Sequence, residues 1–214
     1  MKKHTKAIEC NAYYHIYNRG INVEAVFKNE NNYAFFLLQY SKFIEPIADT
    51  YAYCLLSNHF HFLIKTKCTQ EIIDYSEKLK GKENWISESI DLKPSSFYIS
   101  NQFAKLFNSY AQAINKAENR VGSLFESPFR RIKVTSDSYF SHLVYYIHNN
   151  PKKHGFVLDF RRYRHSSYNS HLTSFQTKLK REELLEWFGS KEQYEIFHGM
   201  NHTESEIQDL VIEF

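Results

Sequence analysis

Two β-prone stretches separated by only two residues fix the centre of the predicted fold. Residues 50–56 and 59–66 are rich in apolar and aromatic side chains. This spacing predicts a hairpin of two antiparallel strands. Because alternate side chains of a strand point to the same face, His59 and His61 are expected to project together, whereas Phe60 points to the other face, toward a core.

The segments around this hairpin alternate between strand and helix patterns. The expected elements are, in order, a strand at 12–20, a helix at 29–43, the hairpin, a helix at 97–119, a strand pair or bent strand at 123–134 and a helix at 138–150. This order favours an α+β fold in which an antiparallel sheet is flanked by helices. With 214 residues, 43% of them hydrophobic, the chain is large enough for a full core.

Capping and helix-breaking residues set the expected boundaries. Ser136 offers an N-cap for the last of these helices, and Pro151 is expected to end it. Residues 68–96 have mixed charge and only a short helical pattern, so we interpret them as an insertion. The main domain is expected to span residues 8–172, and an acidic helical C-terminal extension is expected over residues 173–214.

Charge is distributed unevenly along the chain, although the formal net charge is only +3. Residues 101–181 carry 14 basic and 4 acidic side chains, whereas residues 182–214 carry 1 basic and 9 acidic side chains. The basic segment favours a polyanion as partner, with a solvated charged surface as the alternative. The chain also has 16 Tyr and 18 Phe, rings that fill cores or stack on exposed bases.

The cysteine and hydropathy patterns favour a soluble, cytoplasmic protein. The 3 cysteines show no paired spacing, as expected in a reducing compartment. No stretch approaches membrane-spanning length, and the first residues lack the apolar region of a secretory signal. We therefore expect no membrane partner.

A second segment carries side chains that complete one site with the two histidines. In the last predicted helix, Tyr146 falls at the margin of the apolar arc, and Asn150 follows on the same face one turn later. Tyr145 is expected to point away from the arc, to solvent. If this face packs beside the hairpin, His59, His61 and the Asn150 oxygen form a ligand set for a divalent metal ion.

Such a set suits phosphodiester cleavage through a covalent intermediate. A tyrosine that attacks phosphorus keeps the 5′ phosphate as a phosphotyrosine, which conserves the bond energy for rejoining. A phenol with an ordinary pKa of about 10 needs a local positive field to react at neutral pH. The hypothesis therefore requires the Tyr146 phenol to be accessible and close to both imidazoles.

Several ordered motifs of the chain resemble those of the REP-associated tyrosine transposases, which are single-tyrosine members of the HUH endonuclease superfamily. The motifs are YHIYNRG, HFH, GSLFESPFRRIKV, YIHNNPKKHG and RYRHSSY. They lie within residues 12–66 and 97–172. The long linker at 68–96 and the acidic extension depart from the family pattern.

The resemblance implies a role for each residue of the predicted site. His59 and His61 would be metal ligands with Asn150 as the third ligand, and Tyr146 would be the nucleophile. Two imidazoles and an amide oxygen leave open positions for water and phosphate, which favours Mg²⁺ or Mn²⁺ as the ion. The implied fold is an antiparallel sheet with a ferredoxin-like core and flanking helices. The implied activity is cleavage and rejoining of single-stranded or hairpin DNA. A monomer is expected over a homodimer, and whether Tyr146 serves its own chain's site or a partner's stays open.

Basic and aromatic residues of the middle segment are expected to bind the DNA. The basic side chains would contact phosphates, and Phe129, Tyr163 and Tyr168 would stack on bases. The expected DNA-binding residues are Arg19, Arg130, Arg131, Lys133, Lys152, Lys153, Arg161, Arg162, Arg164 and Tyr168.

Each of these features also has an ordinary structural interpretation. His59 and His61 would then be hydrogen-bonded surface histidines, Tyr146 a packing residue and Asn150 a helix terminator.

Two other functions remain open. A non-catalytic module that binds nucleic acid on the same fold predicts unchanged affinity when both histidines become Ala. A metal-dependent phosphodiesterase for small nucleotides predicts turnover without a covalent protein–DNA species.

Overall fold

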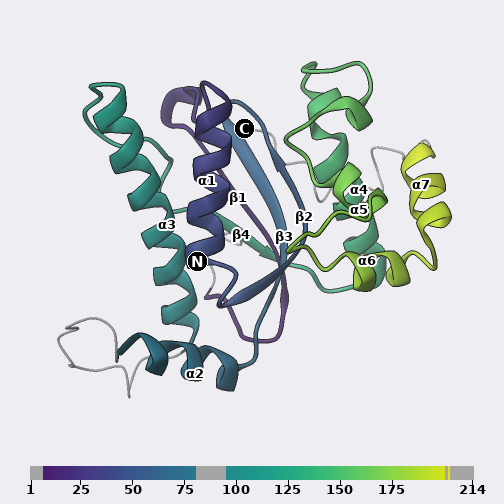
Figure 1. Ribbon diagram of the computed structural model, residues 1–214, viewed down its shortest axis with the longest axis horizontal. Coiled ribbons are helices and arrows are strands. Elements are labelled where there is room, and N and C mark those ends of the chain that lie inside the picture. The colour runs from purple at the N-terminus through teal and green to yellow at the C-terminus, as the bar shows by residue number, and fades with distance from the viewer. Residues whose placement is uncertain (1–6, 81–94, 201, 203–214) are drawn as a thin grey trace.

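A four-stranded antiparallel sheet forms the centre of the molecule (Figure 1). The computed structural model describes residues 7–80, 95–200 and 202. The strands are β1 (Tyr13–Arg19), β2 (Ala48–Leu55), β3 (His59–Thr66) and β4 (Arg130–Lys133), in the sheet order β2-β3-β1-β4. The helices are α1 (Glu30–Phe43), α2 (Thr69–Lys80), α3 (Ser95–Ala117), α4 (Asp137–Lys153), α5 (Tyr168–Leu172), α6 (Arg181–Trp187) and α7 (Lys191–Gly199), with short 3-10 helices η2 (Ile21–Val23) and η4 (Phe160–Arg162).

The connections between these strands have a ferredoxin-like pattern. Strand β1 leads through α1 to β2, the hairpin returns through β3, and α3 leads to β4 at the edge beside β1. Two split βαβ units of this kind place the first and third strands at the centre of the sheet. The predicted α+β fold with an antiparallel sheet and flanking helices is confirmed.

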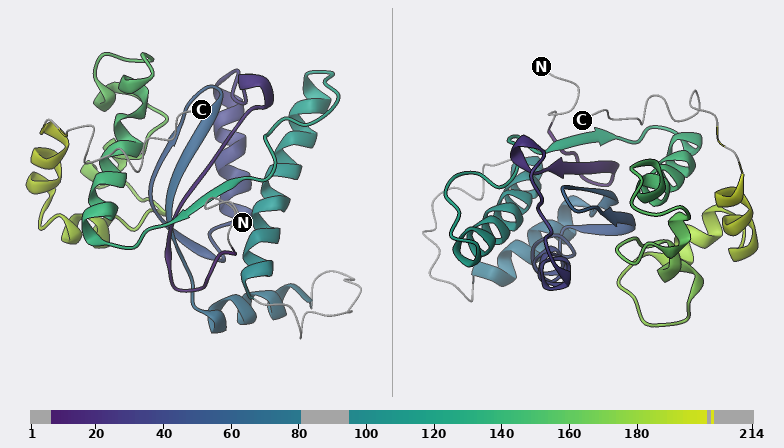
Figure 2. Two further views of the ribbon diagram at one scale, coloured as in Figure 1. Left: turned by 180° about the vertical axis from the view of Figure 1, so that it is seen from behind. Right: turned by 90° about the horizontal axis from the view of Figure 1, so that it is seen from above.

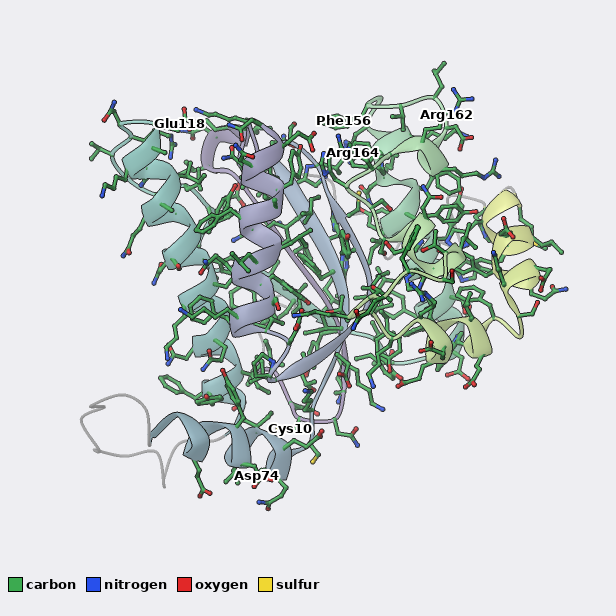
Figure 3. The ribbon with its side chains drawn as sticks, viewed as in Figure 1. Cys10, Asp74, Glu118, Phe156, Arg162 and Arg164 are labelled. Carbon is green, nitrogen blue, oxygen red and sulfur yellow. The ribbon has the colours of Figure 1, made fainter. Side chains whose placement is uncertain are left out.

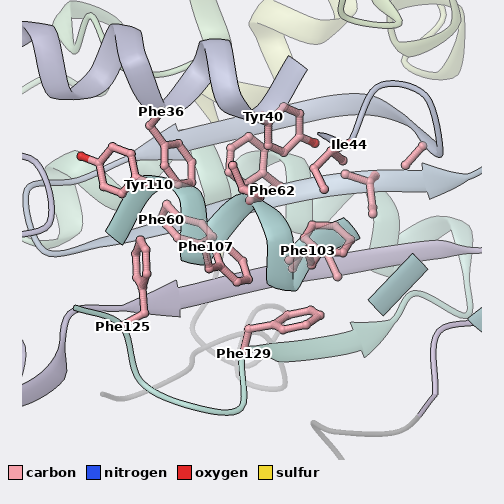
Figure 4. Close-up of a cluster of buried hydrophobic side chains, with 14 of the residues drawn as sticks. Phe36, Tyr40, Ile44, Phe60, Phe62, Phe103, Phe107, Tyr110, Phe125 and Phe129 are labelled. Carbon is pink, nitrogen blue, oxygen red and sulfur yellow. The ribbon is translucent and has the colours of Figure 1, made fainter. Parts of the chain in front are cut away.

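The first core lies between the sheet and the helices α1 and α3 (Figure 4). Phe60 and Phe62 of β3 point into it, as the alternation of the strand predicts. The Phe60 ring packs against Phe36 of α1 and Phe107 of α3, with centroids 5.1 and 5.7 Å away. Burial of each such ring stabilises the fold by about 2–3 kcal/mol, so this face anchors β3 firmly.

The second core lies on the opposite face of the sheet, under α4 and the C-terminal helices (Figure 2). Leu63 of β3 meets Leu143 and Ile147 of α4 there, and Leu184 and Tyr194 of the C-terminal extension belong to the same cluster. The described part of the extension therefore packs on α4. The sheet is thus covered on both faces, and β3 is held between the two cores.

Some predicted boundaries shift in the structure. The long helix expected at 97–119 is α3, two residues earlier, and α4 begins after Ser136, whose hydroxyl accepts a hydrogen bond from the amide of Tyr139 at 3.2 Å. Within the predicted insertion, α2 is a 12-residue helix that packs against α3. Residues 81–94 of the insertion, and 201 and 203–214 of the extension, lie outside the described residues.

Candidate metal and nucleic-acid site

Two histidines of β3 project from the sheet toward α4. His59 and His61 are 4% and 0% exposed, and their ring centroids are 5.3 Å apart with perpendicular planes. Phe60, between them, belongs to the opposite core. The two imidazoles therefore lie side by side on a strand that both cores hold in place.

Each of these imidazoles has its Nδ1 atom held by a neighbour. Oδ1 of Asn58 lies 2.7 Å from Nδ1 of His59, and Nε2 of His15 lies 2.9 Å from Nδ1 of His61. Because a carboxamide oxygen only accepts, Nδ1 of His59 is the donor, and its Nε2 keeps a lone pair. Histidines that bind metal ions are commonly held in this way through the second ring nitrogen.

Burial keeps both imidazoles neutral. It lowers the pKa of His59 to about 3, with smaller contributions from His154 and Arg19, and it lowers the pKa of His61 well below the usual range. Metal ions bind the neutral form of imidazole. At neutral pH the pair is therefore in the protonation state that metal binding needs.

Helix α4 and its C-cap carry three polar side chains at intervals of four residues, and two of them contact these histidines. The Tyr146 ring lies 5.5 Å from the His61 ring, and the His154 ring lies 4.9 Å from the His59 ring, measured between centroids. Asn150 falls between them on the same helical face and is fully buried. Tyr146 thus lies beside the histidines of its own chain.

The Asn150 carboxamide has an oxygen that the described protein does not use. Its Nδ2 donates to the Tyr146 carbonyl at 2.8 Å, whereas its buried Oδ1 accepts no hydrogen bond from the described residues. A buried carbonyl oxygen in this state destabilises a fold unless a water molecule or a ligand uses it.

The donor atoms fit a metal ion that uses both nitrogen and oxygen ligands. Within the described ranges, no group of three or more His, Cys, Asp or Glu side chains is arranged to hold a metal ion. A divalent ion beside Tyr146 would therefore need Nε2 of His59, Nε2 of His61 and Oδ1 of Asn150, with water or phosphate in its remaining positions.

The prediction that Pro151 ends the helix is wrong. Pro151 is buried inside α4, which ends at Lys153 and is followed by Gly155 at φ +73°. Proline removes only the hydrogen bond to the carbonyl four residues earlier, and this loss is tolerated so close to the helix end. The additional turn carries Lys153 and His154 over the site, where Nζ of Lys153 lies 5.6 Å from the Tyr146 ring centroid.

The Tyr146 ring is close to the His61 imidazole, but it is not accessible in this conformation. The residue is 2% exposed, so the structure does not meet the accessibility that the hypothesis requires. Tyr145 is only partly exposed, because its ring centroid lies 4.1 Å from that of His202 and 6.1 Å from that of His198. The C-terminal extension covers the face of α4 that the helical pattern assigns to solvent.

An open cavity of about 390 Å³ borders the site at His59. Its walls come from the end of β1, the turn between β2 and β3, and the segment after α4, with Arg19, Asn58, His154 and Phe156 among the lining residues. Phe156 is 43% exposed and lies at the same end of the molecule as Arg162 and Arg164 (Figure 3). A phosphate that entered this cavity would meet His59 and His154.

The basic residues expected to bind DNA are spread over several elements, and many of them form ion pairs. Arg131 lies over the Phe129 ring at 4.8 Å, and Lys152, Lys153 and Arg162 are exposed. The ion pairs are Arg19–Glu126 (2.5 Å), Arg130–Glu126 (3.2 Å), Lys133–Glu9 (2.6 Å), Arg161–Asp159 (3.7 Å) and Arg164–Glu30 (3.3 Å).

The aromatic residues expected to stack on bases are packed inside the protein instead. Phe129 lies against Phe103 in the first core, with ring centroids 5.1 Å apart. Tyr163 donates its hydroxyl to a backbone carbonyl of β2 at 2.8 Å. Tyr168 is 2% exposed and stacks on Tyr194 of the extension. The assignment of Tyr168 to DNA binding is therefore corrected, because its ring fills the second core.

Sequence reasoning missed two histidines of the site. His15 lies in the first predicted strand, but the face it shares with His61 follows only from the register in which Tyr17 is opposite His61. His154 lies in the YIHNNPKKHG motif beyond the expected helix end at Pro151, and only the longer α4 brings it beside His59.

Comparison with known proteins gives a fold neighbour. The structure is similar to a solved structure of a REP-associated tyrosine transposase bound to a REP hairpin, with a TM-score of 0.56, 11% sequence identity, and coverage of 80% of this chain and 86% of that chain. At this identity the likeness shows a shared fold alone. No family model and no curated protein matches the sequence. Each helix in the described residues is too short or too polar to span a membrane.

Proposed function

We propose that the protein is a metal-dependent, transposase-like DNA nuclease and strand transferase. It would cleave and rejoin single-stranded or hairpin DNA through a covalent 5′-phosphotyrosine. The observation that carries this proposal is the contact between the Tyr146 ring of α4 and the His61 ring of β3, whose centroids are 5.5 Å apart although the two residues are far apart in the sequence. His59 lies beside His61, and Asn150 follows Tyr146 one helical turn later. The fold shared with a REP-associated tyrosine transposase supports the same function.

The proposed chemistry exchanges one phosphoester bond for another. The Oη atom of Tyr146 bonds to phosphorus as the bond from phosphorus to the 3′ oxygen breaks. The phenol loses its proton and the 3′ oxygen gains one, so protons balance, and attack by a 3′ hydroxyl reverses the step and rejoins DNA. The positive charge of Lys153 over the ring favours the negative charge that develops on the phenol. Mg²⁺ or Mn²⁺, when held by His59, His61 and Asn150, supplies polarisation of the phosphate and stabilisation of the leaving oxygen.

The buried phenol sets a condition on this mechanism. DNA must uncover Tyr146 before attack, and the last turn of α4, which holds Lys153 over the ring, is exposed to DNA. Pro151 removes one hydrogen bond from this turn, and the exposed Lys152, Lys153 and His154 belong to it or cap it.

The proposed substrate follows from the cavity and the charges around it. A single strand or hairpin end fits an open cavity with Arg19 on its wall, and the exposed cations Lys152 and Arg162 supply contacts to the backbone. The solved neighbour is itself bound to a REP hairpin. Because Tyr146 lies against His61 of the same chain, we propose a monomer that acts in cis.

A covalent adduct tests the proposed function. The protein is incubated with Mg²⁺ or Mn²⁺ and end-labelled single-stranded or hairpin DNA, and adducts are separated on a denaturing gel. We expect a metal-dependent adduct that Tyr146→Phe abolishes and Tyr145→Phe retains. An adduct that survives Tyr146→Phe would reject Tyr146 as the nucleophile, and no adduct with any of these DNAs would reject the nuclease.

The burial of Tyr146 favours one alternative, a non-catalytic module that binds single-stranded nucleic acid on the same fold. In that case the phenol is a packing residue. The module would bind DNA with the same affinity after His59 and His61 are both replaced by Ala, with or without metal. The nuclease predicts that this double variant loses the metal dependence of DNA binding.

A further inference from the structure

A third histidine, His15, lies against the proposed ligand pair. His15 is on β1 and fully buried, and it is a diagonal neighbour of His61, since Tyr17 is the residue opposite His61. The rings of His15 and His61 stack with centroids 5.1 Å apart, and Nε2 of His15 lies 2.9 Å from Nδ1 of His61. Nothing in the proposed reaction assigns a role to this contact.

A hydrogen bond between two imidazoles has two possible directions, and they differ in what His61 can do. If Nε2 of His15 donates, Nδ1 of a neutral His61 accepts, and the His61 proton is on Nε2. If Nδ1 of His61 donates, Nε2 of His61 has a lone pair instead. Only the second arrangement lets His61 bind a metal ion through Nε2, because its Nδ1 is occupied by His15.

We propose that His15 is a positioning residue, which accepts the Nδ1–H of His61 and thereby keeps His61 in the tautomer that binds metal through Nε2. This inference rests on the proposed metal-dependent function. Asn58 holds His59 in the same way, since its Oδ1 accepts from Nδ1 of His59 at 2.7 Å. Each proposed imidazole ligand therefore has its own acceptor, one from β1 and one from the turn before β3.

Another buried histidine pair offers a matched control. Nδ1 of His148 on α4 lies 2.9 Å from Nε2 of His198 on α7, and Nε2 of His148 lies 2.8 Å from the Ser167 hydroxyl. Both ring nitrogens of His148 are thus used within the protein. This pair has the same hydrogen-bond length as the His15–His61 pair and is also buried, but it joins α4 to α7 of the extension.

The tautomer of His61 can be measured in the metal-free wild type by ¹⁵N nuclear magnetic resonance of the histidine rings. The His61 signals are assigned from their loss in His61→Gln. We expect a proton on Nδ1 and none on Nε2. A His61 proton on Nε2 would overturn the positioning role directly, and this readout needs no variant of His15.

Mn²⁺ affinity then tests the consequence, measured by calorimetry on the full chain. His15→Phe keeps a ring but has no acceptor, and we expect its dissociation constant to rise about 10–100-fold. His15→Gln offers Oε1 as an acceptor, so its affinity should stay close to that of the wild type. His148→Gln should also leave the affinity unchanged. Near-ultraviolet circular dichroism confirms that each variant is folded.

Failure of this inference differs from failure of the proposed function. If the wild type binds no Mn²⁺, the metal-dependent function fails and the positioning role fails with it. If the wild type binds Mn²⁺ and His15→Phe binds it equally well, His15 is a packing residue only, and the metal site stands. If His15→Phe does not fold, two results still overturn the positioning role. One is a proton on Nε2 of His61 in the wild type, and the other is a clear loss of Mn²⁺ affinity in His15→Gln.

Discussion

The substitution Asn150→Leu tests whether Asn150 serves to bind a ligand or to stabilise the fold. A buried carbonyl oxygen without a partner costs about 1–3 kcal/mol, whereas the bond from Nδ2 to the Tyr146 carbonyl contributes only about 1 kcal/mol. Leu has neither group and a similar volume. Without metal, we therefore expect Asn150→Leu to be about 0–2 kcal/mol more stable than the wild type. Each kcal/mol raises Tm by about 2–4 °C in a chain of this size.

In the presence of metal, the wild type should gain more stability than Asn150→Leu. An ion at 100 times its dissociation constant stabilises the wild type by about 2.7 kcal/mol. If the loss of the Asn150 oxygen weakens binding about tenfold, the same ion concentration stabilises the variant by only about 1.4 kcal/mol. The metal-dependent increase in stability should thus be at most about half that of the wild type.

Urea unfolding followed by far-ultraviolet circular dichroism, in EDTA and in Mn²⁺, measures both effects. Asn149→Leu is the matched control. Its Oδ1 is likewise buried and accepts no hydrogen bond from the described residues, but Asn149 is off the helical stripe that faces the histidines. The control should keep the full metal effect. Our reasoning is refuted if Asn150→Leu is more than about 2 kcal/mol less stable than the wild type in EDTA, or if it keeps the full metal effect.

Three further predictions concern stability and DNA affinity. Burial lowers the pKa of His59 and of His198 to about 3, so the unfolded chain binds protons that the folded one does not. In EDTA, the free energy of unfolding should therefore be highest above about pH 6.5. It should fall by about 1.4 kcal/mol per pH unit for each such histidine as the pH drops toward 3. Urea midpoints that stay constant between pH 7 and 4 would contradict this. Phe60→Ala, in the first core, should cost about 3–5 kcal/mol in urea unfolding, whereas the exposed Leu38→Ala should change stability by less than about 0.5 kcal/mol. DNA affinity should fall steeply with salt in a binding titration, and Lys152→Ala should reduce the slope of log affinity against log salt by about one; an unchanged slope would remove Lys152 from the interface.

The features that the sequence predicts well belong to single segments. Alternation along β3 is enough to place Phe60 and Phe62 in the first core and the two histidines on the α4 face. The position of Ser136 before an apolar helix is enough to predict the N-cap of α4. In both cases the side-chain pattern and the backbone geometry of one element decide the outcome.

The features that sequence reasoning misses depend on contacts between distant segments. Tyr145 and Tyr168 look accessible in their local patterns, but residues of the C-terminal extension pack against both. His15 joins the site only through the pairing of β1 with β3, and His154 joins it only because α4 continues past Pro151. No local pattern carries that information, since strand register and helix coverage are set by tertiary packing.

The position of a bound ion tests the central claim most directly. Crystals soaked in Mn²⁺, with anomalous diffraction to locate the metal, give its ligands without reference to activity. We predict one ion within about 2.3 Å of Nε2 of His59, Nε2 of His61 and Oδ1 of Asn150, with waters in its other positions. An empty site at saturating Mn²⁺, or an ion that binds the protein only elsewhere, would contradict the claim that these residues form a metal centre beside Tyr146.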